Sequence, residues 1–292
     1  MTVSDYLASV EQRFAQANLC YGHGTDNALD EAVYLVYASL GIDFSVAVRD
    51  CQQEMTAAQH ADLEAKVQRR IETREPVAYI VGESWFCGLP FFSDQRALIP
   101  RSPFAELIAN KFQPMLNSEP QHILDLCSGS GCIGIACALT FPNARVDLVD
   151  ISVQALALAT KNINRHGTSD RARALHSDLY SAISQRYDLI VANPPYVSAS
   201  EVNTLPPEFG HEPRLGLESD EDGLAIPLAI LRQSEEYLFD DGLLLMEVGY
   251  NAENLQSRLP DLPILWMEFD QGGEGVMAIT AAQLRQFREA LN

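Results

Sequence analysis

From residue 103 onward, short apolar runs of strand length alternate with stretches in which apolar residues recur at helical spacing. A strand, a helix and a second strand in this order form a right-handed parallel unit, so the pattern predicts an α/β fold with an open, mostly parallel sheet. The predicted strands lie at 122–127, 145–150, 172–176, 187–192, 243–248, 263–269 and 275–280, with helices between them, one near 224–238. Ligands bind such sheets beyond the carboxyl ends of the strands, where we expect a functional site.

The residues before this alternation have a different pattern. Residues 1–76 carry apolar side chains at helical spacing, as between Leu29 and Leu40, and predict a small helical domain. Residues 77–99 are aromatic and β-branched with Gly88 near their centre, which predicts a β-hairpin linker. Residues 100–292 then form the sheet domain, and a length of 292 residues is consistent with more than one domain.

The charge balance restricts the partners of the chain. Its 40 Asp and Glu residues against 20 Lys and Arg give a net charge of −20, which argues against affinity based on phosphate neutralisation and suits a basic partner. We therefore expect no direct DNA binding. The chain has no basic and apolar leader and no apolar run of membrane-spanning length, so we expect a cytoplasmic protein without a membrane segment. Its six cysteines form no C-x-x-C pair, which predicts reduced thiols and no metal site.

The stretch DLCSGSGCIG, residues 125–134, follows the first strand of the predicted sheet. Gly129, Gly131 and Gly134 match the pattern G-x-G-x-x-G, and Asp150 lies at the tip of the next strand. Glycines let the backbone approach a ligand closely, and a carboxylate so placed can accept hydrogen bonds from two ribose hydroxyls. The turn is compatible with a nicotinamide dinucleotide, with S-adenosylmethionine, or with a tight turn that binds nothing, and by itself it does not distinguish among them.

Further predicted cofactor contacts flank this turn. Asp178 follows the third strand, where its carboxylate can accept from an adenine amino group with Leu179 against the ring; the alternative is an acid on a surface loop. The full set of predicted cofactor-binding residues is Asp125, Cys127, Ser128, Gly129, Ser130, Gly131, Asp150, Ile151, Asp178, Leu179 and Asn193.

The fourth strand ends in Asn193-Pro194-Pro195-Tyr196, within YDLIVANPPYVSAS (187–200). Prolines supply carbonyl acceptors without N–H donors, and the Asn193 side chain adds a carbonyl oxygen. Two acceptors beside an aromatic ring can hold a planar NH₂ group and aim its nitrogen lone pair at a sulfonium methyl group. Hydride transfer does not require a pair of acceptors around an NH₂ group. The stretch therefore favours S-adenosylmethionine over the nicotinamide dinucleotide as the cofactor. We predict that Asn193, Pro194 and Tyr196 are catalytic and that Pro195 joins them in binding the substrate.

These motifs together resemble the class I methyltransferases that modify planar amino groups, which include adenine-amino DNA enzymes and the HemK/PrmC protein-glutamine methyltransferases. Segment 97–108 (ALIPRSPFAELI) resembles the segment that follows the hairpin in the glutamine enzymes. Four further segments resemble the PrmB branch of that family: YGHGTDNALDEAVYLV (21–36), WFCGLPF (85–91), LPPEFGHEPRLGL (205–217) and EFDQGGEGV (268–276). The resemblance covers nearly the whole chain. Cys127 departs from the wider family, which often has glycine there.

The resemblance implies a Rossmann-like methyltransferase sheet, S-adenosylmethionine as cofactor, and methylation of a glutamine side-chain amide in large-subunit ribosomal protein three. It also implies that Asn193 and Pro194 grip the glutamine, Tyr196 packs on it, and Asp150 holds the cofactor ribose. The alternatives are glutamine methylation of peptide release factors, adenine-amino methylation of nucleic acid, a non-catalytic module that binds ribosomal proteins, and a nicotinamide oxidoreductase.

Two further features bear on the substrate. The acidic segment, residues 201–222, carries seven acids and a single base, Arg214. We expect it to attract a basic ribosomal protein, although a solvated loop would have the same composition. The helical domain is expected to recognise the substrate, and His23, between Gly22 and Gly24, is expected in a loop turn or partner contact.

Overall fold

The computed structural model describes residues 1–116, 118–270 and 272–291, so position 271, inside the last quoted motif, lies outside the described residues. The helices are α1 (Val3–Gln16), α2 (Ala28–Leu40), α3 (Ala57–Thr73), α4 (Val77–Val81), α5 (Phe104–Ala109), α6 (Cys132–Thr140), α7 (Val153–Arg165), α8 (Ala199–Val202), α9 (Ala225–Tyr237), α10 (Ala252–Arg258) and α11 (Ala281–Gln286). The strands are β1 (Glu83–Phe86), β2 (Leu89–Phe92), β3 (His122–Leu126), β4 (Arg145–Asp150), β5 (Ala172–His176), β6 (Tyr187–Ala192), β7 (Leu238–Glu247), β8 (Leu265–Trp266) and β9 (Val276–Thr280).

Seven strands form one sheet in the order β5-β4-β3-β6-β7-β9-β8. The pairings among β5, β4, β3, β6 and β7 are parallel, and β9 runs antiparallel to both β7 and β8. The chain builds outward from β3 to β5 and then returns to place β6 on the other side of β3. The strand order therefore reverses between β3 and β6, which is where open α/β sheets bind ligands.

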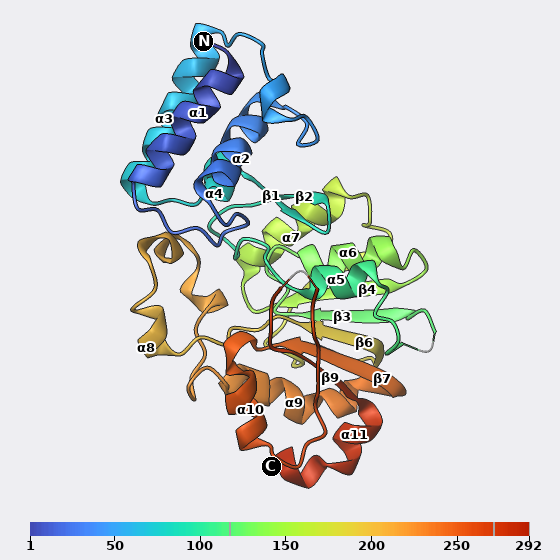
Figure 1. Cartoon of the computed structure of the whole chain (residues 1–292). Helices are drawn as coiled ribbons and strands as arrows, with labels where there is room; N and C mark the ends of the chain where they lie inside the picture. Colours follow the sequence, from blue (N-terminus) through green and yellow to red (C-terminus); the bar gives the residue numbers. More distant parts are fainter. Residues whose placement is uncertain (117, 271, 292) are drawn as a thin grey trace.

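Helices cover both faces of this sheet, with α5, α6 and α7 on one face and α9, α10 and α11 on the other (Figure 1). Strand β6 shows why its sequence is almost entirely apolar: Leu189 and Val191 belong to one core, while Ile190 and Ala192 belong to the other. A strand buried on both faces needs no polar alternation. The predicted fold class, a mostly parallel α/β sheet with a helical N-terminal region, is confirmed.

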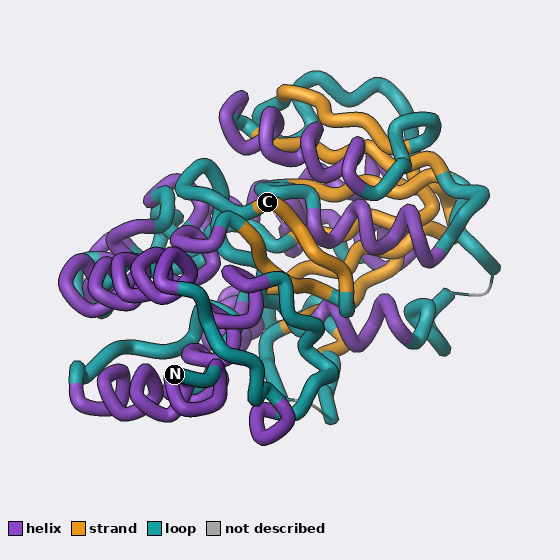
Figure 2. The backbone as a smooth tube through the Cα atoms, turned by 90° about the horizontal axis from the view of Figure 1, so that it is seen from above, coloured by secondary structure: helices purple, strands orange, loops and turns teal. Residues whose placement is uncertain are grey.

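Helices α1 to α4 build a separate apolar core at the N-terminal end of the chain. Thr2 and Thr56 begin α1 and α3 with capping boxes, in which the Thr hydroxyl and the side chain three residues on satisfy backbone N–H groups. Figure 2 shows these helices on one side of the molecule and most strands on the other. None of the described helices is both long and apolar enough to cross a membrane.

The β-hairpin is shorter than predicted for residues 77–99. Strands β1 and β2 pair only from Glu83 to Phe92, and Val77–Val81 form helix α4 instead. Val77, Ala78 and Tyr79 pack into the N-terminal core, and that burial stabilises a helical turn in spite of the β propensity of Val77 and Tyr79. The strand prediction for these residues was therefore wrong.

Candidate functional site

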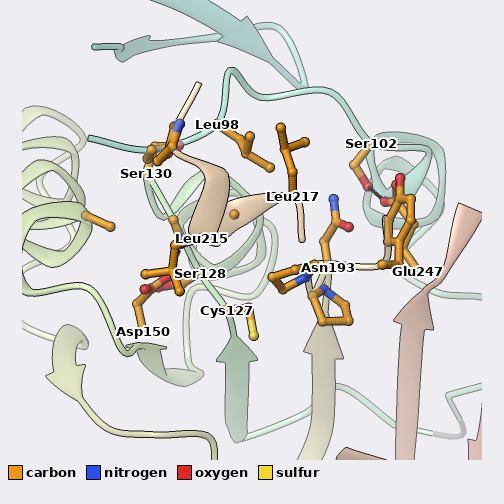
Figure 3. A pocket seen from close by; sticks show the side chains of 18 of the residues that line it. Leu98, Ser102, Cys127, Ser128, Ser130, Asp150, Asn193, Leu215, Leu217 and Glu247 are labelled. Carbon is orange, nitrogen blue, oxygen red and sulfur yellow. Dashed lines mark hydrogen bonds between the residues drawn. The ribbon is translucent and has the colours of Figure 1, made fainter. Parts of the chain in front are cut away.

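A cavity of about 650 Å³ opens at the carboxyl ends of β3, β4 and β6, beside the reversal in strand order. Two segments from outside the sheet complete its walls: residues 96–103 and several residues of the 205–217 stretch. Figure 3 shows Asp150, Ser128 and Cys127 on one side of this space and Ser102 and Glu247 on the other, with Asn193 between them. The glycine turn, the tip of β4 and the Asn193-Pro194-Pro195-Tyr196 stretch therefore meet in one cavity.

The glycine turn after β3 has its shape because only glycine fits two of its positions. Gly131 has φ +82°, and a Cβ there would lie 2.6 Å from Leu148 Cδ2. At Gly134 a Cβ would lie 2.8 Å from Asp125 Oδ2, which accepts the Gly134 N–H. These glycines allow α6 to pack closely on β3 and β4.

Asp150 ties the tip of β4 to this turn. Its Oδ2 accepts the Gly129 N–H at 2.9 Å, and its Oδ1 accepts the Ser152 N–H at 2.8 Å. Burial raises the pKa of Asp150 in spite of these hydrogen bonds. Beside it, the buried Ser128 hydroxyl has no hydrogen-bond partner among the described residues. A carboxylate with spare lone pairs and an unpaired hydroxyl fit a polar ligand such as the ribose and amino-acid part of a cofactor.

The cavity includes most of the predicted cofactor set. Its lining contains Cys127, Ser128, Gly129, Ser130, Asp150, Ile151, Asp178, Leu179 and Asn193. Asp125 and Gly131 are not among the residues that line it, and their contact with a cofactor stays a prediction. Asp125 lies beneath the turn with only 1% of its surface exposed, and burial raises its pKa to about 8.

Cys127 occupies a strained backbone position at the start of the turn, with φ +57°. Burial raises the pKa of its thiol, so the sulfur is no ready nucleophile. All six cysteines are free thiols. Among the described residues, no group of three or more His, Cys, Asp or Glu side chains is placed to hold a metal ion.

Asn193, Pro194, Pro195 and Tyr196 all line the cavity at the tip of β6. In Figure 3 the Asn193 amide points into the space between Leu217 and Glu247. The Tyr196 hydroxyl donates to Glu247 Oε1 at 3.0 Å. The stretch therefore presents acceptors and an aromatic ring to the same cavity that contains Asp150.

Two of the seven acids in the acidic segment do not belong to the open acidic surface that its sequence predicts, whereas Glu201, Asp220, Glu221 and Asp222 are exposed. Glu208 and Glu212 are 1% and 5% exposed. Glu208 Oε1 lies 3.3 Å from Arg70 Nη1 and accepts the Cys20 N–H, while Glu212 is paired with Arg101. The expectation of a substrate-attracting surface is wrong for these two acids.

His23 is also buried rather than free for a partner. Its ring packs against that of Phe209 at an interplanar angle of 51°, with 4.5 Å between ring centroids, and its Nε2 lies 3.4 Å from Glu212 Oε2. The N-terminal domain therefore contacts the 205–217 stretch through buried side chains. Figure 1 shows the N-terminal domain and this stretch lying side by side.

Glu247 lines the cavity and was not predicted as a site residue. It ends β7, is 5% exposed, and accepts the Ser102 hydroxyl at 2.6 Å in addition to that of Tyr196. Burial raises its pKa to about 7. The sequence held a signal for it, because a lone acid interrupts the otherwise apolar run LLLMEV, residues 243–248.

Two protein-family models match the chain: a Methyltransferase small domain over residues 105–207 and a PrmC N-terminal domain over residues 5–82. Among solved structures, the hMettl16 catalytic domain in complex with MAT2A 3'UTR hairpin 6 is similar with a TM-score of 0.52 and 14% identity, covering 77% of this chain and 82% of that one. At that identity the likeness concerns the fold alone.

Two relatives are similar over nearly their whole length. A protein of Francisella tularensis subsp. tularensis named ribosomal protein uL3 glutamine methyltransferase is 39% identical, covering 99% of this chain and 93% of that protein. A protein of the same name from Xanthomonas campestris pv. campestris is 45% identical, covering 97% of this chain and 92% of that protein. The chain therefore belongs to the family of the ribosomal protein uL3 glutamine methyltransferases.

Proposed function

We propose that the protein transfers a methyl group from S-adenosylmethionine to the side-chain amide nitrogen of a glutamine in ribosomal protein uL3. One observation carries the chemistry: Asn193, Pro194 and Asp150 line a single cavity. Its volume of about 650 Å³ is in the range of small-molecule and cofactor sites.

The residues divide into two groups by chemistry. Asp150, Ser128 and the backbone of Gly129 offer the acceptors and donors that a ribose and an amino-acid moiety need. Asp178 and Leu179 offer an acceptor and an apolar surface for an adenine. The cofactor, when bound, supplies an electrophilic methyl group on a sulfonium.

Asn193 and Pro194 act on the substrate amide. Its nitrogen is a poor nucleophile because its lone pair is delocalised into the carbonyl. Acceptance of both N–H bonds, by Asn193 Oδ1 and the Pro194 carbonyl, favours a pyramidal nitrogen and stabilises the positive charge that develops on it. Tyr196 provides a flat surface beside the amide. The proton that the methylated amide loses is acidic, so no strong base is required.

The substrate assignment rests on the names of the two full-length relatives. We assign substrate recognition to residues 1–76, with 77–99 as linker and 100–292 as the catalytic domain. Buried contacts from Arg70 and His23 to Glu208 and Glu212 support this role, because they attach the N-terminal helices to the stretch that lines the cavity. A cytoplasmic location and the absence of direct DNA binding remain predictions.

The test offers labelled S-adenosylmethionine with three substrates in parallel: unmethylated uL3, unmethylated release factor and DNA. We expect label on uL3 alone, and mass spectrometry should place it on one glutamine side chain. Label on release factor would agree with methylation of an amide and would contradict the assignment of uL3 as the substrate. Label on DNA would overturn the protein-substrate assignment altogether.

A further inference from the structure

The carboxyl of Glu247 connects two cavity-lining residues from distant parts of the chain. Its Oε1 accepts the Tyr196 hydroxyl at 3.0 Å, and its Oε2 accepts the Ser102 hydroxyl at 2.6 Å. Figure 3 shows Ser102 and Glu247 together at the end of the cavity next to Asn193. Both carboxylate oxygens are therefore occupied, and one of them is bound to the ring system beside the proposed amide site.

Other contacts hold the ring and the backbone carbonyl of Tyr196 in place. A Cβ on Gly249 would lie 2.8 Å from Tyr196 Cε2, so the ring packs directly on the glycine backbone. The Asn251 side chain donates to the Tyr196 carbonyl at 2.6 Å, and a Cβ on Gly223 would lie 2.2 Å from that carbonyl oxygen. The ring face and the backbone are thus held by close packing, and Glu247 holds the hydroxyl end.

The apolar neighbours of Glu247 on β7 give no reason for a carboxyl at this position. The preceding residues of β7, Leu243 to Met246, are buried and apolar. A buried carboxyl costs free energy, and apolar side chains of similar volume often pack at least as well. Burial raises the pKa of Glu247 to about 7, against the opposing effects of Ser102, Tyr196 and Arg101. Groups kept under such conditions concentrate at functional sites.

We propose that Glu247 is a positioning residue for methyl transfer, which acts by fixing the Tyr196 ring against the amide that Asn193 and Pro194 hold. The proposal deepens the proposed function and rests on it for the identity of the amide. Ser102 holds the second carboxylate oxygen, so that the first points at the Tyr196 hydroxyl. Glu247 itself need not touch the reacting atoms.

The test is a double-mutant cycle between Glu247→Leu and Tyr196→Phe. Leucine removes both acceptor oxygens and fills the space, while phenylalanine removes only the hydroxyl. We expect Glu247→Leu to lower kcat by about tenfold to a hundredfold, the cost of a slightly misplaced group, with the Kd of the cofactor changed by less than about threefold. Combined with Tyr196→Phe, the loss should stay close to that of Glu247→Leu alone, because both changes break the same contact.

Glu247→Gln provides the rescue. Its amide oxygen can still accept from Tyr196 and its NH₂ group can donate to Ser102, so most of kcat should return. Tyr187→Phe is the matched control, because the Tyr187 hydroxyl donates to Asp147 Oδ2 at 2.7 Å at the start of β6, away from the cavity. We expect kcat unchanged within about twofold for that variant.

If the two substitutions lower kcat independently, so that their fold-losses multiply in the double variant, the positioning role is overturned. A loss of cofactor affinity as large as the loss of kcat would overturn it as well. If Glu247→Leu does not fold, Glu247→Ala takes its place in the same cycle.

A second readout needs no substrate: ring-¹³C-tyrosine NMR, with the Tyr196 signal assigned through Tyr196→Phe. Glu247→Leu should shift that signal and Glu247→Gln should restore it, whereas an unmoved signal contradicts the proposal. A wild-type protein that leaves uL3 unlabelled refutes the proposed substrate, and the NMR result then decides on Glu247 separately.

Discussion

Arg101 and Glu212 form a doubly hydrogen-bonded ion pair beside the cofactor cavity, with 2.7 Å from Nη1 to Oε1 and 2.6 Å from Nη2 to Oε2. The Ile99 N–H also donates to Glu212 Oε1, and His23 Nε2 lies 3.4 Å from Oε2. One buried carboxylate therefore joins the N-terminal region, the 96–103 wall and the 205–217 wall. The shape of the cavity depends on this junction.

Glu212→Gln should destabilise the protein, because it leaves the partly buried Arg101 guanidinium without its counter-charge. Burial by itself raises the pKa of Glu212. The charges and hydrogen bonds of Arg101 and His23 outweigh that effect and lower this pKa to about 2. A shift of this size from 4.5 corresponds to roughly 3 kcal/mol of stability near neutral pH. Chemical denaturation of the variant and the wild type measures the difference.

The pH dependence follows from the sign of this shift. Because the folded-state pKa is depressed, the stabilisation is fully present above about pH 4.5 and is lost as the pH falls toward about 2. The difference between wild type and Glu212→Gln should therefore narrow on acidification. Glu218→Gln, which breaks only the exposed pair with Arg214, is the control and should cost less than about 1 kcal/mol. Equal costs for the two variants would contradict the structural role of Glu212.

Asn193→Ala should lower turnover steeply and leave the Kd of S-adenosylmethionine within about threefold of wild type. The reason is that its amide oxygen is assigned to the reacting nitrogen, a contact that strengthens as charge develops there. Single-turnover methylation and calorimetric cofactor binding separate the two effects. A parallel loss of cofactor affinity would mean that Asn193 mainly holds the cofactor.

Asp150→Ala should have the opposite effect, chiefly a weaker affinity for the cofactor. It removes the proposed ribose acceptor and releases the Gly129 N–H. Asp188→Ala is the matched control, because Asp188 likewise accepts two backbone N–H groups, from Gln121 and His122, but at the other end of the sheet. The control should lose stability and keep its cofactor affinity; calorimetry that finds the same affinity loss in both would assign the effect of Asp150 to folding.

Cys127→Gly should stabilise the protein. Cys127 has φ +57°, a left-handed conformation that glycine adopts without steric cost. The gain should be roughly 0.5 kcal/mol, since the more flexible unfolded chain offsets part of the relieved strain. Cys127→Ala keeps the Cβ and the strain, so it should give no gain. If denaturant midpoints show alanine and glycine to be equally stabilising, the thiol and not the backbone is responsible.

Much of the sheet and the centre of the site follow from local sequence. The apolar runs that became β3, β4, β5 and β6, the glycine turn and the Asn193-Pro194-Pro195-Tyr196 stretch were placed correctly because each signal lies within a few consecutive residues. Parallel strands then bring their carboxyl ends to one edge, so motifs that are far apart in sequence meet without any further information.

Only the tertiary structure decided which charged residues are buried and what they hold. Glu208 and Glu212 sit in an acidic stretch that looks exposed in sequence, yet their partners Arg70 and Arg101 are 138 and 111 residues away. Glu247 meets Tyr196 across 51 residues. Residues 77–81 are helical because the N-terminal core buries them. A buried carboxylate needs partners that compensate its desolvation, and for these three acids the partners lie far away in the sequence.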